Sequence, residues 1–140
     1  MNEPTIRLEN PPSEEDRRKI MDGLLAHNRT RTGDGNYENL TFLVRDAEGE
    51  LIGGLLGEIY WGWLHIDVLW VNERSRKKGL GRKLMEAAER AAAERGCHSA
   101  FLDTFSFQAL PFYVKMGYQI FGELPDFPAG HARPLTNAIT

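Results

Sequence analysis

The chain has 140 residues, of which 41% are hydrophobic and 26% are charged, a composition typical of one globular domain over residues 1–140. No apolar run reaches the roughly 18 residues needed to cross a membrane, and residues 1–4 lack the basic and apolar segments of a signal peptide, so we expect a cytoplasmic protein without a membrane partner. The single cysteine, Cys97, excludes an internal disulfide and paired-cysteine metal sites, and we expect no metal.

The net charge of −3 conceals an uneven distribution. Residues 74–83 contain six of the 17 Lys and Arg residues and none of the 20 Asp and Glu residues, which leaves 11 basic and 20 acidic residues, or −9, elsewhere. Nucleic-acid-binding proteins usually present a broad basic face, so this pattern argues against a nucleic-acid partner. One compact basic segment on an acidic chain favours a small, highly charged anion as the ligand.

The first part of the chain predicts a short strand, a helix and a polar connection. Residues 5–8 read as the strand. Ser13, followed three residues later by Asp16, is a helix-start signature, and apolar residues follow it at helical spacing. Residues 30–39 are polar and contain glycine, which favours a loop or a frayed helical turn. The apolar stripe of the helix consists of Ile20, Met21, Leu24 and Leu25.

Three strands are expected next, over residues 41–46, 51–60 and 61–71. In the third, an apolar set alternates with a set that begins polar and ends apolar, so the first set is predicted to face the core. The predicted core-facing set is Leu64, Ile66, Val68 and Trp70. The opposite set is His65, Asp67, Leu69 and Val71.

The rest of the chain predicts helix, strand, helix and strand, over residues 79–95, 98–105, 108–116 and 118–123. Pro134 would interrupt a central strand, so residues 132–139 are expected to form an edge strand at best. This order of elements predicts an α/β fold with a mixed sheet, antiparallel early and parallel across the later strand–helix–strand unit.

Gly79 and Gly81 stand where a predicted strand gives way to a predicted helix. The first N–H groups of a helix have no partner within the helix, and glycine lets a ligand approach them closely. With the surrounding Arg and Lys residues, they predict a cradle for a phosphate or a pyrophosphate. The alternative is a helix start that carries a solvated basic turn. Neither the Walker loop nor the dinucleotide-binding fingerprint is matched.

Two motifs resemble those of the GCN5-related N-acetyltransferase (GNAT) family. Residues 76–81, Arg-Lys-Lys-Gly-Leu-Gly, match the Arg/Gln-x-x-Gly-x-Gly/Ala motif that holds the pyrophosphate of acetyl-CoA in that family. The segment LHIDVLWV is similar to the family's fourth strand. The family's Ala-x-x-x-Tyr-x-x-x-Gly-Phe/Tyr block is matched by Ala109, Tyr113, Gly117 and Tyr118.

The resemblance implies a single-domain acyl-CoA N-acyltransferase fold, with a mostly antiparallel central sheet, splayed strands four and five, and helices on both faces. It implies transfer of an acetyl group from acetyl-CoA, as co-substrate, to an amine. Main-chain groups of Leu69 and Val71 would pair with the pantetheine arm. Ser106 stands where the family often has asparagine. The implied acetyl-CoA contacts are Leu69, Trp70, Val71, Arg76, Lys77, Lys78, Gly79, Leu80, Gly81, Arg82, Ser106 and Tyr113.

Transfer to an amine requires the acceptor to lose a proton and the leaving thiolate to gain one. The resemblance implies that Tyr113 is the acid, and a ring that packs the last helix on the sheet is the alternative. Family bases often lie on the fourth strand, where His65 and Asp67 share a face. Histidine titrates near neutral pH, whereas an aspartate would need burial or an intervening water. Structural hydrogen bonding is the alternative for both, and Asp103 and Glu58 are weaker candidates.

The acceptor pocket is expected to come from residues 26–39 and 60–63, with a contribution from the tail. Trp61 and Trp63 with nearby acids would suit a cationic amine, whether a small molecule or a peptide, and the alternative places the tryptophans on the surface or in a homodimer contact. Cys97 is expected to be a buried apolar residue, and His131 to be structural or an acceptor-side contact. The nearby acids are Glu58, Asp67, Asp103 and Asp126.

A second class of function stays open, a non-catalytic module that binds or senses acetyl-CoA. The presence of Tyr113 favours the enzyme. Release of free CoA thiol that depends on an acceptor would distinguish the two classes.

Overall fold

Helix α1 (Glu14–Thr32) begins where the sequence indicates. Ser13 precedes it in an extended conformation, and the Ser13 hydroxyl oxygen accepts a hydrogen bond from the Asp16 N–H at 3.0 Å. Its apolar stripe is exposed, since no residue of α1 is buried. The expectation of a strand over residues 5–8 is wrong. These residues are exposed and irregular, and residues 3–35 contain no strand with which they could pair.

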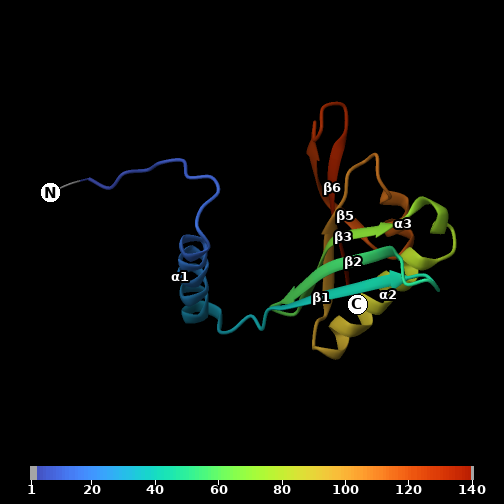
Figure 1. The fold of residues 1–140 in the computed structure, drawn as a ribbon, viewed down its shortest axis with the longest axis horizontal. Coiled ribbons are helices and arrows are strands. Elements are labelled where there is room, and N and C mark those ends of the chain that lie inside the picture. Colours follow the sequence, from blue (N-terminus) through green and yellow to red (C-terminus); the bar gives the residue numbers. More distant parts are fainter. Residues whose placement is uncertain (1–2, 140) are drawn as a thin grey trace. The chain divides into compact units, whose positions relative to one another are not determined.

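The computed structural model describes residues 3–139 and separates them into two compact units, divided between Gly35 and Asn36. The first unit contains α1, and the second contains the sheet and the remaining helices (Figure 1). No helix in the described range is both long and apolar enough to cross a membrane.

The second unit is built on a mixed sheet whose six described strands have the order β1-β2-β3-β4-β6-β5 (Figure 1). Strands β3 and β4 run parallel, and the other neighbouring pairs run antiparallel. The predicted mixed sheet, antiparallel in its early strands, is confirmed. The bounds are β1 (Glu38–Arg45), β2 (Leu51–Tyr60), β3 (Trp63–Val71), β4 (Ser99–Asp103), β5 (Gln119–Pro125) and β6 (Ala132–Ile139).

Strand β6 lies between β4 and β5, so the expectation that residues 132–139 form an edge strand at best is wrong. Pro134 is tolerated inside the sheet because β4 ends beside it, where the last β4–β6 pair joins Asp103 to Leu135. Beyond that pair the Pro134 carbonyl accepts a hydrogen bond from the Thr104 N–H at 3.2 Å, which needs no N–H from proline.

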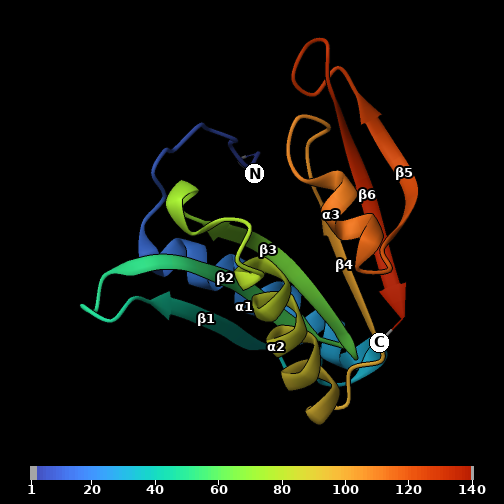
Figure 2. The same cartoon turned by 90° about the vertical axis from the view of Figure 1, so that its right-hand side faces the viewer.

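Helices α2 (Leu80–Glu94) and α3 (Leu110–Lys115) lie on one face of the sheet, α2 over β1–β3 and α3 over β4 and β6 (Figure 2). Leu84 and Ala88 of α2 are buried in the core. The buried residues that the sheet contributes to this core include Leu40, Leu55, Ile59, Leu64, Ile66, Ala100 and Leu102.

The hairpin turn between β2 and β3 consists of Trp61 and Gly62. Both residues have positive φ values, 47° and 78°, which is typical of the two-residue turns that join twisted antiparallel strands. The turn fixes the register of the hairpin and places Glu58 directly opposite His65.

A bulge at Asp67 reverses the side-chain alternation of β3. The register of the β2–β3 pair shifts there, and Asp67 has no partner on β2. Before the bulge, Leu64 and Ile66 face the core as predicted. After the bulge, the two sets of alternating residues exchange faces. Val68 and Trp70, expected in the core, are 44% and 48% exposed, so that expectation is wrong. The β3 residues that face the core are Leu64, Ile66, Leu69 and Val71.

Candidate functional site

Strands β3 and β4 are joined at one end and open at the other. They pair at three positions, the last of which joins His65 to Phe101. Strand β3 continues to Val71 and β4 to Asp103 without further pairing, and the strands diverge (Figure 2). This divergence, the fork, has its closed end at His65 and its open end at Val71. The splaying that the family resemblance implies for its fourth and fifth strands is confirmed here for β3 and β4.

The main chain of β3 offers hydrogen-bonding groups at the open end of the fork. The Asn72 N–H donates to a β2 carbonyl at 2.8 Å, so strand alternation directs the N–H and C=O groups of Leu69 and Val71 away from β2. The Val71 carbonyl accepts a hydrogen bond from Arg76 Nε at 2.9 Å. Trp70 directs its main-chain groups toward β2 instead. The open edge of β3 therefore suits an extended ligand that adds to it like a strand.

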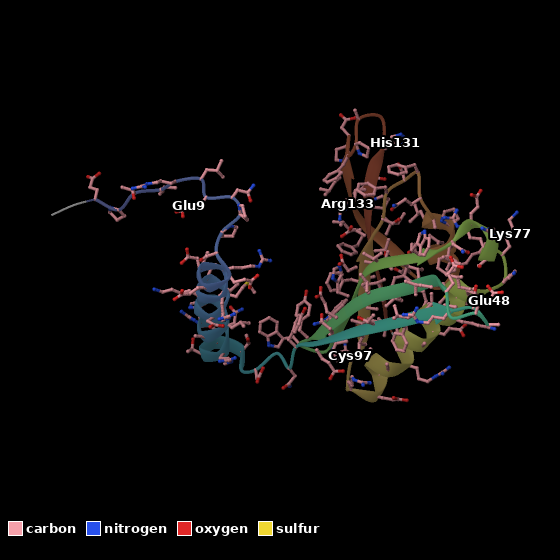
Figure 3. The ribbon with its side chains drawn as sticks, in the orientation of Figure 1. Glu9, Glu48, Lys77, Cys97, His131 and Arg133 are labelled. Carbon is pink, nitrogen blue, oxygen red and sulfur yellow. The ribbon has the colours of Figure 1, made fainter. Side chains whose placement is uncertain are left out.

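The turn from β3 into α2 forms a candidate anion cradle. Lys77 (Figure 3) and Gly79 have left-handed φ values of 65° and 76°. Gly79 caps α2 without a side-chain hydrogen bond, and no acid lies in the first turn of the helix. The first N–H groups of α2 are therefore left with positive potential and no side-chain acceptor, which is what an anion site requires.

The two glycines of the cradle differ in how well their positions would accept a side chain. At Gly79 the positive φ would strain most other residues. Gly81 lies in the regular helix, where an added Cβ would meet the Phe112 ring at 3.5 Å, an ordinary contact. The packing of the protein therefore leaves room for a Cβ atom at Gly81.

The basic residues of the cradle are exposed. Lys77, Lys78 and Arg82 lie on the surface beside the first turn of α2, which Leu80 begins. Arg82 Nε lies 2.9 Å from Glu86 Oε1, whereas neither Lys77 nor Lys78 forms an ion pair within residues 3–139. Both lysines are therefore available to an anion.

Tyr113 lies on α3, one residue after the ring that faces Gly81. It is 8% exposed, and its ring packs edge-to-face with Tyr118 at 6.2 Å between centroids. Burial raises the pKa of the Tyr113 phenol, which keeps it protonated at neutral pH. The Tyr118 hydroxyl donates to Glu89 Oε2 on α2 at 3.0 Å. The position is compatible both with packing and with donation of a proton.

Three polar side chains are linked at the closed end of the fork. His65 Nδ1 lies 2.8 Å from Glu58 Oε1, and the Tyr37 hydroxyl donates to Glu58 Oε2 at 2.7 Å. The hydrogen bond from His65, followed by that from Tyr37, lowers the pKa of the Glu58 carboxyl, so it is ionised at neutral pH. The His65 ring stacks on the Phe101 ring, with 4.6 Å between centroids. Two candidates that the sequence suggests separately therefore form one pair.

An aromatic pocket lies beside these residues. It has a volume of about 420 Å³ and is lined by Trp63, Phe101, Phe121 and Asn137. Trp63 packs edge-to-face against Phe101 at 5.9 Å. Trp63 and Asn137 come from segments in which an acceptor pocket is expected, whereas Trp61 is 43% exposed in the hairpin turn and does not line it.

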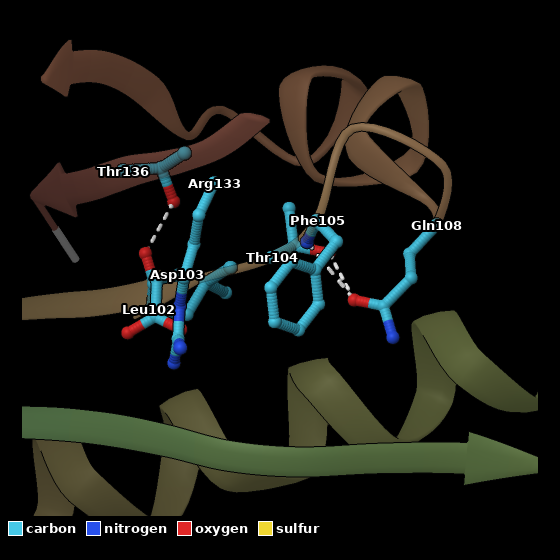
Figure 4. A network of polar contacts seen from close by, with 7 residues as sticks. All are labelled: Leu102, Asp103, Thr104, Phe105, Gln108, Arg133 and Thr136. Carbon is cyan, nitrogen blue, oxygen red and sulfur yellow. Dashed lines mark hydrogen bonds and ion pairs between the residues drawn. The ribbon is translucent and has the colours of Figure 1, made fainter. Parts of the chain in front are cut away.

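The two aspartates considered as bases have different surroundings. Asp67 is exposed at the bulge. Asp103 Oδ1 accepts hydrogen bonds from Arg133, including one from Nε at 2.7 Å (Figure 4). The Arg133 guanidinium lies 5.0 Å from the ring centroids of both Phe105 and Phe127. Asp103 therefore joins β4 to β6.

Ser106, His131 and Cys97 take part in local structure. Ser106 Oγ accepts a hydrogen bond from the Ala132 N–H at 2.9 Å, and its own hydroxyl hydrogen remains able to donate to a ligand. The His131 ring, at the tip of the β5–β6 hairpin (Figure 3), packs edge-to-face against Phe107 at 5.0 Å. Cys97 is buried, and burial raises the pKa of its thiol, which disfavours a nucleophilic thiolate.

Tyr37, Phe101 and Asn137 have no sequence signal of their own that predicts a place in this site. Each comes from a different segment, and the sheet brings them together. The pair of Glu58 and His65 does have a signal, because a two-residue hairpin turn between two strands fixes which residues lie opposite each other.

The model of the acetyltransferase (GNAT) family matches residues 5–118, which is more than half of the chain. The chain belongs to the GNAT family. The matched region contains the cradle, the open edge of β3 and Tyr113, whereas β6 and its pocket residue Asn137 lie beyond it.

Individual GNAT proteins resemble the chain to different extents. Blasticidin-S acetyltransferase from Streptomyces morookaense is 47% identical over 83 residues, 59% of this chain and 61% of that protein, so the chain spans less than two thirds of that relative. An acetyltransferase from Agrobacterium fabrum is 34% identical over 113 residues, 81% of this chain and 82% of that protein. The crystal structure of an acetyltransferase from Bacillus cereus has 33% identity and a TM-score of 0.85, and the match covers 96% of this chain and 98% of that chain.

Proposed function

We propose that the chain is an N-acetyltransferase that transfers the acetyl group of acetyl-CoA to a primary amine. The observation that carries the proposal is the start of α2, which has no side-chain cap and no acid in its first turn and lies beside the open end of the fork, in a chain of the GNAT family. GNAT proteins use acetyl-CoA, which supplies an activated acetyl group as a thioester. Its diphosphate suits the cradle, and its extended pantetheine arm suits the open edge of β3.

Different residues at the open end bind different parts of acetyl-CoA. The N–H groups of the first turn of α2 bind the diphosphate, and Lys77 and Lys78 add positive charge. Leu69 and Val71 offer main-chain groups to the pantetheine arm. An N–H near Leu69 would polarise the thioester carbonyl, an effect often worth 10²-fold or more in rate.

Tyr113 is the proposed acid of the reaction. Because burial keeps its phenol protonated at neutral pH, it has a proton to donate to the departing CoA thiolate. The position of α3 beside the cradle supports this assignment.

The proposed acceptor is a small-molecule amine. The pocket of about 420 Å³ offers aromatic rings for an apolar or planar group, and the ionised Glu58 nearby favours a cation. The name of the Streptomyces relative makes blasticidin S the first antibiotic to test. A homodimer stays a prediction from the family.

Binding of acetyl-CoA, measured by titration calorimetry, tests the cradle. We expect wild-type protein to bind in the micromolar range typical of enzyme substrates. Gly81→Glu should bind at least about 100-fold more weakly, because a carboxylate at the start of α2 repels the diphosphate. Gly81→Ala is the matched control and should bind normally, because its Cβ makes only an ordinary contact with Phe112. A wild-type protein that does not bind acetyl-CoA would overturn the proposal.

Release of free CoA thiol in the presence of a panel of amines, blasticidin S among them, tests turnover. Acceptor-dependent release supports the enzyme. Binding without release for any amine would favour the non-catalytic module that senses acetyl-CoA.

A further inference from the structure

The hydrogen bond between Glu58 and His65 determines where the histidine carries its hydrogen. Glu58 is ionised, because its hydrogen bonds to His65 and Tyr37 lower its pKa, and an ionised carboxylate only accepts hydrogen bonds. The contact of 2.8 Å between Glu58 Oε1 and His65 Nδ1 therefore requires the hydrogen on Nδ1. In the neutral ring this leaves the lone pair on Nε2.

Glu58 is in turn held from its other side. The Tyr37 hydroxyl donates to Glu58 Oε2 at 2.7 Å and lies 3.1 Å from Asn39 Oδ1. The hydrogen bond to Glu58 raises the pKa of Tyr37, which keeps the hydroxyl protonated and able to donate. Both oxygens of the Glu58 carboxylate are thus engaged, so it cannot rotate without losing a hydrogen bond. The segment before β1, strand β2 and strand β3 together fix the orientation of the His65 ring.

His65 occupies the place where the parts of the proposed reaction meet. Its pair with Phe101 is the last rung before the fork opens toward the edge that suits the pantetheine arm. Its ring stacks on Phe101 with 19° between planes, and Phe101 also lines the aromatic pocket. The contact with Glu58 uses Nδ1, so Nε2 is the ring nitrogen that remains for a ligand.

We propose that His65 is the general base of the transfer and that Glu58 and Tyr37 are its positioning residues; this rests on the proposed acetyltransferase function. The nitrogen of the neutral amine bonds to the thioester carbonyl carbon, and the carbon–sulfur bond breaks with its electron pair on sulfur. The amine proton passes to His65 Nε2, and Tyr113 gives its hydroxyl proton to the thiolate. Solvent then returns a proton to Tyr113 and removes the proton from His65. The negative charge of Glu58 stabilises the protonated ring between these events.

Other titratable groups around this network come from three strands. Tyr60 on β2 and Asp67 on β3 act electrostatically on Tyr37. Asp103, two residues after Phe101 on β4, is neutralised by its ion pair with Arg133 of β6. None of these three groups forms a hydrogen bond with the His65 ring, so Glu58 is the charged group that orients it.

The first test measures the tautomer of His65 by ¹H–¹⁵N nuclear magnetic resonance of the histidine side chains, with no substrate present. The spectrum of His65→Gln assigns the signal among the four histidines of the chain. Wild-type protein should show the hydrogen on Nδ1, and Glu58→Ala should lose that preference. Glu48→Ala, which removes an exposed carboxylate from the β1–β2 turn (Figure 3), is the matched control and should leave the signal unchanged. A wild-type ring without hydrogen on Nδ1 would overturn the proposal.

The second test measures kcat/KM for the amine as a function of pH. His65→Ala should lower kcat/KM by about 10²–10⁴-fold, remove the acidic limb of the profile, keep wild-type binding of acetyl-CoA, and regain part of its rate with added imidazole. Glu58→Gln should lose less activity. Tyr37→Phe, which removes the hydrogen bond to one oxygen of the Glu58 carboxylate, should lose less still, and Glu48→Gln should match wild type.

The outcomes separate the two proposals. Turnover by His65→Ala at the wild-type rate would overturn the base assignment and leave the acetyltransferase in place. Absence of acetyl-CoA binding by wild-type protein would overturn the acetyltransferase and the base assignment together.

Discussion

The two ends of the fork differ in the groups that they present to a ligand. At the open end, near Val71 and Gly79, main-chain groups are available to a ligand and basic side chains add charge. At the closed end, side chains from separate segments surround His65 and form hydrogen bonds and ring contacts. A main-chain site needs glycines and a particular turn, which leave a pattern within a few residues. A side-chain site is assembled by the sheet and, apart from the hairpin pair of Glu58 and His65, leaves no such pattern.

Because of this difference, substitutions at the two ends should affect different measurements. Changes at the cradle should alter the dissociation constant of acetyl-CoA. Changes around His65 should alter kcat/KM for the amine and its pH dependence while leaving acetyl-CoA binding intact. A substitution that changed both to the same extent would show that the two ends form one site.

Tyr113→Phe is expected to have the largest effect on kcat, because Tyr113 is the proposed acid. Tyr113 lies at the open end of the fork but acts in the chemistry. Loss of the proposed acid should lower kcat by about 10²–10⁴-fold. The phenyl ring preserves the packing against Tyr118, so the dissociation constant of acetyl-CoA should stay at the wild-type value in calorimetry. A wild-type kcat would show that Tyr113 serves packing alone.

Asp103→Asn is expected to weaken the link between β4 and β6 and to lower the stability of the protein. Arg133, half-buried between two aromatic rings, would lose its charged partner, and the free energy of unfolding should fall by about 1–3 kcal/mol in urea titrations. Glu86→Gln removes an exposed ion pair with Arg82 and should change that free energy by no more than about 0.5 kcal/mol. Equal losses in the two variants would contradict a structural role for Asp103.

Glu89→Gln tests the stability of α2, the helix whose first turn forms the cradle at the open end. Glu89 lies on α2 and accepts a hydrogen bond from Tyr118. Burial raises the pKa of the Glu89 carboxyl, so the folded state favours its protonated form relative to the unfolded chain. The protonated carboxyl contributes stability below the ordinary pKa of 4.5. This stability is lost as the pH rises through the raised pKa of Glu89 in the folded state. Glu89→Gln still accepts from Tyr118. It should raise the melting temperature at about pH 7.5 and change it little at about pH 4. A larger gain at the lower pH would contradict this.

Asp67→Asn should have the smallest effect, although Asp67 lies in sequence between the two ends. Its side chain is exposed at the bulge, so kcat/KM should stay within about two-fold of wild type, as for most surface substitutions. A loss comparable with that of His65→Ala would transfer the base assignment to Asp67.

The parts of the fold that the sequence predicts have local causes. Ser13 caps α1 and Gly79 caps α2 through bonds and backbone angles within one turn of chain. The glycine cradle and the splayed strands are likewise predictable, because a short motif and a family resemblance specify them. The pair of Glu58 and His65 also has a local cause, the two-residue turn between their strands, but strands expected over residues 51–60 and 61–71 leave no room for that turn, so the pair is not predicted.

The parts that the sequence does not predict depend on neighbours far along the chain. Val68 and Trp70 alternate as core residues should, but one unpaired residue at the bulge moves them to the other face. Pro134 argues against an internal strand only if both neighbours extend past it, and β4 does not. Tyr37 reaches Glu58 across a separation of 21 residues, which no local pattern encodes.

The internal place of β6 has a consequence for the order in which the protein takes shape during synthesis. Strand β4 pairs with β3 at three positions, and its other partner, β6, is the last of the described strands to leave the ribosome. Arg133, which binds Asp103, and Asn137, which lines the aromatic pocket, both belong to this late strand. The cradle at the start of α2 needs neither residue. Synthesis of the chain therefore completes the residues of the cradle before it completes those that line the aromatic pocket.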